Sequence, residues 1–148
     1  MSTLKTNAVE SRSGSALAIG DSGDTVTLTG TVKTASATTW DKAQRGAITA
    51  LTSATTVTID MAVNNNFSCT MAHNIAFANP SNIVAGQSGS IFLTQDGTGS
   101  RTGSWGTYWD FIGGTAPTLT TTAAGVDRID YVVLDSTNIQ AVATLAYS

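Results

Sequence analysis

Apolar residues fall on every second position over one long stretch of this chain, and that alternation constrains the fold more than any other feature. A period of two places one set of side chains on one face of a β-strand, so residues 57–77 are predicted to form strands with a single buried face. The residues in question all have odd numbers: Val57, Ile59, Met61, Val63, Phe67, Cys69, Met71, Ile75 and Phe77.

The alternating stretch is interrupted at Asn64–Asn66, whose side chains suit a tight turn. We therefore predict that residues 57–63 and 67–77 form an antiparallel hairpin that reverses at these asparagines. Pro80 follows the second strand, and a proline cannot donate to a strand ladder, so the strand is predicted to end there.

A Gly- and Thr-rich segment, Gln95–Thr102, separates the apolar strand Ser90–Thr94 from a strand that passes through Trp105. It contains the pair Asp96-Gly97, which is a strong short-range signal for a hairpin turn. The sequence predicts a second hairpin here.

The last strands of the chain are predicted at 126–134 and 139–147, joined by the turn residues 135–138. Short strands separated by turns are typical of sandwiches and jelly rolls. We predict an all-β protein whose main domain, residues 40–148, is a β-sandwich or jelly-roll-like domain.

The first 39 residues contain short alternating stretches, Leu17–Ile19 and Val26–Leu28, with turn residues between them. This segment has too few large apolar side chains to build a core of its own. It is predicted to be an extended N-terminal β arm that lies on the main domain or on other copies of the chain.

Charge excludes some classes of function. Charged residues make up 11% of the chain, the net charge is −3 and the seven basic residues are scattered, whereas soluble domains average roughly 25% charged residues. Nucleic-acid binding needs clustered Lys and Arg, so it is not expected. Membrane insertion is not expected either, because no run of apolar residues is long enough to span a bilayer and no secretion signal precedes the arm. The chain is expected to be made in a cytoplasm.

Catalytic and metal-binding patterns are not found. The one histidine, His73, falls on the apolar parity of its strand, and no second histidine or cysteine pair accompanies it, so a hydrogen-bonded structural role is favoured. Cys69 is interpreted as a small buried hydrophobe. We predict a protein that is not an enzyme and that has no catalytic, metal or cofactor site.

The acidic residues are the remaining candidates for glycosidase or Ca²⁺ chemistry. They are Asp96, Asp110, Asp127, Asp130 and Asp135. Asp96 and Asp135 lie in predicted turns, where Asp commonly bonds its own backbone. Asp127, Arg128 and Asp130 are interpreted as solvated or paired charges at a strand edge, and no series of alternating aspartates suggests Ca²⁺.

Trp105, Tyr108 and Trp109 form an aromatic group beside Gly-rich loops, and Arg101 lies in the predicted turn before them. These four residues are the candidate contact surface. Exposed aromatic side chains could stack on a sugar or form a protein-contact hot spot. The alternative, which the spacing favours, is that the aromatic side chains close one end of the core.

Three segments, Gln87–Thr102, Gly113–Thr120 and Val126–Val133, resemble a module of tailed-phage virion proteins found in tail fibres and other minor structural proteins. The arm is similar to the strand-turn repeats of fibre stalks at Leu4–Glu10 and Leu17–Val26. The resemblance covers roughly residues 79–143 and brings no catalytic residue with it.

The resemblance implies a virion structural protein at the particle surface, a homotrimer that contacts other virion proteins such as the major capsid protein or tail and fibre proteins. Either a capsid decoration (cement) protein or a fibre-like appendage fits it. The alternative function is a tail-fibre or receptor-binding protein that recognises a host surface glycan through the aromatic group. A thin arm would gain stability if three copies wrapped together.

Overall fold

The computed structural model describes residues 25–27, 29, 37, 39, 41 and 43–147. The chain divides into two units, Met1–Lys42 and Ala43–Ser148. The second unit, called the body below, carries all the elements described here. The predicted strands of the arm fall almost entirely outside the described residues.

Strands and one short 3₁₀ turn supply the regular structure of the body, and the described residues contain no α-helix. The all-β prediction is therefore confirmed for this part of the chain. In chain order the elements are β1 (Ile48–Ala50), β2 (Thr56–Val57), β3 (Asn66–Met71), β4 (Ile75–Phe77), β5 (Ser88–Gln95), β6 (Gly103–Trp105), β7 (Trp109–Phe111), η1 (Ile112–Gly114), β8 (Val126–Val133) and β9 (Ile139–Tyr147).

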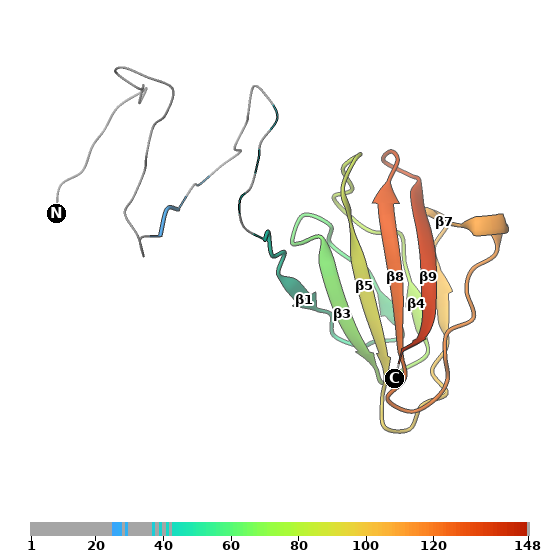
Figure 1. The fold of residues 1–148 in the computed structure, drawn as a ribbon. Helices are drawn as coiled ribbons and strands as arrows, with labels where there is room; N and C mark the ends of the chain where they lie inside the picture. Colours follow the sequence, from blue (N-terminus) through green and yellow to red (C-terminus); the bar gives the residue numbers. More distant parts are fainter. Residues whose placement is uncertain are drawn as a thin grey trace, which may run out of the picture. The chain divides into compact units, whose positions relative to one another are not determined.

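The described strands form two sheets that enclose one core (Figure 1). The larger sheet has six strands in the order β1-β3-β5-β8-β9-β7, and the smaller has three in the order β2-β4-β6. The smaller sheet is parallel throughout, whereas the larger is mixed.

The chain alternates between the two sheets from β1 to β6, so this half of the body is a coil of three turns, β1–β2, β3–β4 and β5–β6. In the larger sheet, Ile48 lies beside Asn66 and Asn66 beside Ser90, so successive turns use 18 and 24 residues. Each turn stacks on the one before it and buries side chains between the sheets, as in solenoid proteins.

The backbones of two turns of the coil approach each other closely at Gly89. A Cβ atom at this position would overlap the backbone oxygen of Asn65. The same oxygen accepts a 2.8 Å hydrogen bond from the hydroxyl of Tyr131 in β8. Only glycine fits here, because any side chain would push the two turns apart.

The other half of the larger sheet is an antiparallel hairpin of β8 and β9, with Val133 beside Ile139 at its closed end. Residues 135–138 form the turn, where Leu134 N–H donates to the Asn138 carbonyl at 2.9 Å. This hairpin was predicted from the sequence and is confirmed. Through β8 it pairs with β5, which joins it to the coil.

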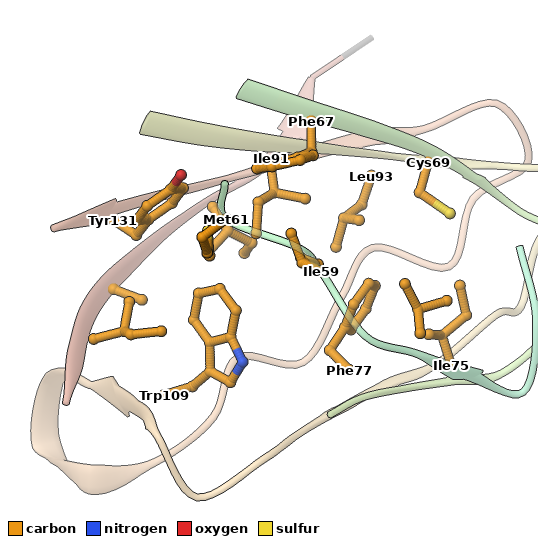
Figure 2. Close-up of a cluster of buried hydrophobic side chains, with 14 of the residues drawn as sticks. Ile59, Met61, Phe67, Cys69, Ile75, Phe77, Ile91, Leu93, Trp109 and Tyr131 are labelled. Atoms are coloured by element: carbon orange, nitrogen blue, oxygen red, sulfur yellow. The ribbon is translucent and has the colours of Figure 1, made fainter. Parts of the chain in front are cut away.

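The core follows the predicted parity closely. Phe67, Ile75, Phe77 and Ile91 are each at most 2% exposed, and Figure 2 shows these side chains converging from opposite sheets. Val63 is the exception among the odd-numbered apolar residues, because it lies in a turn and is 60% exposed.

Two of the three predicted hairpins are wrong. Residues 64–66 do not reverse an antiparallel pair: β3 pairs in parallel with β1 and β5, and β2 pairs with β4. The segment 95–102 joins β5 in one sheet to β6 in the other, so it is a crossing between sheets. The alternation revealed which side chains are buried and carried no information on strand partners.

Candidate functional site

The segment Gln95–Thr102, called the crossing loop below, is held by its own first residues. Gln95 is only 3% exposed. Its side-chain oxygen accepts a hydrogen bond from Arg101 N–H at 2.8 Å, and its side-chain nitrogen donates to the Arg101 carbonyl at 2.9 Å. The side-chain amide thus pairs with both backbone groups of Arg101, as a residue of a neighbouring antiparallel strand would, which satisfies a buried polar group.

The side chain of Asp96 accepts hydrogen bonds from three other residues of the crossing loop. One carboxylate oxygen accepts hydrogen bonds from the N–H groups of Thr98 and Gly99, at 3.1 and 2.9 Å. The other accepts from the Arg101 guanidinium at 2.7 and 3.1 Å. The hydrogen bond from Arg101 is the main reason that the pKa of Asp96 is lowered. The prediction that Asp96 would bond its own turn is confirmed.

The crossing loop packs against residues 115–125, called the strap below, which lead from β7 and η1 to β8. Ser100 N–H donates to the Thr121 carbonyl at 2.7 Å, and Ala124 N–H donates to the Asp96 carbonyl at 3.3 Å. Gly99 is buried, has a φ of 70° and leaves no space for a side chain, since a Cβ would lie 2.6 Å from the Thr121 oxygen.

Asp127 fastens the strap from the other side. It is 2% exposed, and its two carboxylate oxygens accept hydrogen bonds from Thr120 N–H at 2.7 Å and from Ala146 N–H at 3.0 Å. The interpretation of Asp127 as a surface charge is wrong. Its odd position, shared with the buried Ile129 and Tyr131, was the signal that could have placed it inside.

Arg128 and Asp130 agree with their predicted role as a paired charge. The Arg128 Nε atom lies 2.9 Å from an Asp130 carboxylate oxygen, and both side chains are more than a third exposed. Asp130 also accepts a hydrogen bond from the Ser90 hydroxyl at 2.6 Å. This exposed pair contributes about 0–1 kcal/mol at most.

The aromatic group lies at the end of the core beside β4. Trp105 stacks on Phe77 with 4.6 Å between ring centroids, and it makes T-shaped contacts with Trp109 and Phe111 at centroid distances of 5.1 and 5.2 Å. Trp109 is 6% exposed and makes a T-shaped contact with Tyr131. Among the described residues, the Trp105 indole nitrogen is the one buried side-chain polar atom without a hydrogen-bond partner.

The four candidate contact residues therefore occupy two different places. Trp105 and Trp109 pack together in the aromatic group, and Tyr108 lies partly buried against the core with its N–H bonded to the Asn79 side chain. Arg101 belongs to the crossing loop, where its guanidinium is bonded to Asp96. The packed rings close the core, which is the alternative that the spacing favoured.

Other residues considered from the sequence have structural partners. His73 is exposed in the bend after β3, and its Nδ1 lies 3.1 Å from the Ser53 hydroxyl, so it does not share the buried parity of its neighbours. Cys69 is buried, and burial raises the pKa of its thiol. Asp135 bonds the N–H of Thr137 in the hairpin turn, as predicted, and this bond is the first cause of its lowered pKa.

No group of three or more His, Cys, Asp or Glu side chains that could hold a metal occurs in the described part of the chain. That part also holds no helix long and apolar enough to cross a membrane. Comparisons with protein-family models, curated proteins and solved structures found no match.

Proposed function

We propose that this protein is a structural component of a tailed-phage virion, a homotrimer that acts as a capsid decoration or as a fibre-like appendage on the particle surface. Its body is a β-sandwich module, and its N-terminal arm serves in anchoring and trimerisation. The protein works by assembly, without catalysis.

One observation carries this proposal. The three segments that resemble the phage module are separate in sequence, and the third contacts both of the others in the body. Residues 88–94 of the first segment pair with residues 126–132 of the third, and Asp127 of the third segment accepts a hydrogen bond from Thr120 N–H of the second. Segments that act together in one interlocked unit support a shared origin more strongly than three separate short likenesses.

The surface of the body also supports an assembly role. Several large apolar side chains are substantially exposed, including Ile112 at 80%, Val84 at 65% and Val132 at 51%. A body with many exposed apolar side chains and few charges is suited to a large interface with other proteins.

Glycan recognition through the aromatic group remains the alternative function. It would require a ring face open to a sugar, whereas Trp105 is covered by Phe77 and Trp109 is nearly buried. Because these rings pack mainly on one another, assembly is the better supported proposal.

The test is to locate the protein on purified particles by electron microscopy and to measure its mass in solution. We expect a trimer, and density on the capsid in many copies or at the tail in few. A monomer that is absent from particles and has no affinity for capsid or tail components would contradict the proposal.

A further inference from the structure

Strand β9 of the larger sheet is unpaired along the second half of one edge. β7 pairs with Ile139–Ala141 only, whereas β9 continues to Tyr147. Ile139 N–H points towards β7 and donates to the Tyr108 carbonyl at 2.8 Å. Backbone groups alternate sides along a strand, so Ala143 directs its N–H and carbonyl the same way. No described strand pairs with β9 on that side beyond Ala141. Residues 142–147 are called the β9 edge below.

Apolar side chains and two hollows accompany this edge. Val142, Leu145 and Tyr147 are 41–47% exposed, and Ile112, which lines the same hollows as Val142, is 80% exposed. The hollows measure about 530 and 180 Å³, and both are lined by Phe111, Ile112, Ala141 and Val142. Free backbone groups next to apolar hollows fit an extended polypeptide strand whose alternate side chains are apolar.

The β9 edge lacks the usual protection against such pairing. Proteins block exposed edges with charges, prolines or bulges. Residues 142–147 contain no charged residue and no proline. The irregularity in this strand, where Ala146 has a φ of 63°, lies at its far end and leaves Val142–Thr144 regular. An open edge of this kind is expected to be covered in the assembled protein.

The N-terminal unit contains a segment whose sequence matches this edge. Thr25–Val32 consists of Thr, Val, Leu and Gly, so it is uncharged and strong in β propensity. Val26 and Leu28 alternate with threonines, and Val26 is 46% exposed in the single chain. Lys33 follows directly, and Asp110 lines the larger of the two hollows, which provides a complementary charge.

We propose that the β9 edge receives Thr25–Val32 of a second copy of this chain as an added strand. This inference rests on the proposed self-assembly and names the surface that carries it. A ring in which every body receives one strand and supplies one strand to the next leaves no β9 edge unpaired.

Photo-crosslinking of the full chain tests the contact directly. A benzoylphenylalanine replaces Val142, and ¹⁵N-labelled and unlabelled copies are mixed, unfolded and refolded together before irradiation. Mass spectrometry should find crosslinks to the peptide containing residues 25–32, with about half of them joining unlike isotopes, as random assortment requires. Crosslinks that join only like isotopes, that reach β9 of another copy, or that miss residues 25–32 would overturn the proposal.

A charge placed on the edge supplies a second readout. Val142→Lys together with Leu145→Lys should weaken self-association at least tenfold in analytical ultracentrifugation, while circular dichroism shows the same strand content. Val63→Lys is the matched control, because Val63 is 60% exposed in a turn away from the β9 edge. If the double variant misfolds, Val142→Lys alone takes its place. Equal weakening by the edge variant and the control would contradict the proposal.

Different results would overturn the strand addition and the proposed function. A trimer that is present on particles but gives no crosslink to residues 25–32 overturns strand addition and leaves the proposed function standing. A monomer that is absent from particles overturns both.

Discussion

The coil β1–β6 and the hairpin β8–β9 use the same kind of sequence and differ in how their strands find partners. Both regions show alternating apolar residues, and in both the inward side chains are buried. In the hairpin, each strand pairs with its neighbour in sequence. In the coil, each strand pairs with one 18 to 28 residues away, while the next strand in sequence belongs to the opposite sheet.

This difference shows that side-chain parity and strand pairing are separate pieces of information. Parity follows from burial of one face and can be read locally. Pairing depends on where the connection sends the chain, and a short loop can either reverse a strand or carry it to another sheet. The crossing loop has hairpin chemistry in Asp96-Gly97, yet Ser100 bonds the strap, and Thr102 bonds Ile75 at the start of β4.

The largest expected effect comes from Gly89→Ala, which tests the stacking of the coil. The new Cβ would overlap the Asn65 oxygen, so we expect a loss of more than about 4 kcal/mol in the free energy of unfolding, in the range of severe substitutions. Gly97→Ala is the control, since no atom lies within 4 Å of a Cβ there and its effect should stay within about 0.5 kcal/mol. Denaturant unfolding measures both. Equal stability of the two variants would mean that β5 does not lie against residue 65.

Asp127→Ala should have the next largest effect, because Asp127 joins the hairpin to the strap. Removing the buried carboxylate leaves the Thr120 and Ala146 N–H groups without their partner, at a cost of about 2–4 kcal/mol. Asp130→Ala removes an exposed carboxylate from the same strand and should cost about 1 kcal/mol or less. Thermal unfolding of the two variants gives the comparison. A larger loss of stability for Asp130→Ala than for Asp127→Ala would contradict the role of Asp127 in joining the hairpin to the strap.

Tyr131→Phe tests the single hydrogen bond between the hairpin and the coil turn at Asn65. We expect a loss of about 1 kcal/mol in stability, measured by denaturant unfolding. Tyr108→Phe is the control, because its hydroxyl has no hydrogen bond within the described residues.

Burial raises the pKa of Tyr131 to about 12, so the hydroxyl should remain protonated in the folded protein well above pH 10. Ultraviolet titration that shows all tyrosines ionising near pH 10 without unfolding would contradict this packing.

The smallest effect is expected from acid. Asp96 in the crossing loop and Asp135 in the hairpin turn both have a pKa lowered from 3.8 by their hydrogen bonds. A folded-state pKa below the unfolded one gives stability that is present above the unfolded pKa and is lost as the pH falls through the folded pKa. The melting temperature should therefore decrease when the pH is lowered past about 4. In Asp96→Asn or Asp135→Asn, this decrease in melting temperature should be smaller. An unchanged acid response in both variants would show that these bonds do not contribute.

Local signals predicted much of the body. The buried faces at Phe67–Phe77, the β8–β9 hairpin and the turn role of Asp135 each depend on residues close in sequence. The coil could not be predicted in the same way, because its turns use 18 and 24 residues and share no repeated motif that would reveal the period. The interlocked loop, strap and Asp127 depend on long-range hydrogen bonds, for which no spacing rule exists.

The parallel pairing of the coil is the central claim, and inter-strand nuclear Overhauser effects in the ¹³C,¹⁵N-labelled full chain test it most directly. The structure predicts backbone contacts between β3 and β5 near the pairs Phe67 with Ile91 and Cys69 with Leu93. It predicts no antiparallel contacts between residues 57–63 and 67–77. Observation of an antiparallel ladder across Asn64–Asn66, without contacts between β3 and β5, would contradict the coil and restore the hairpin that the sequence suggested.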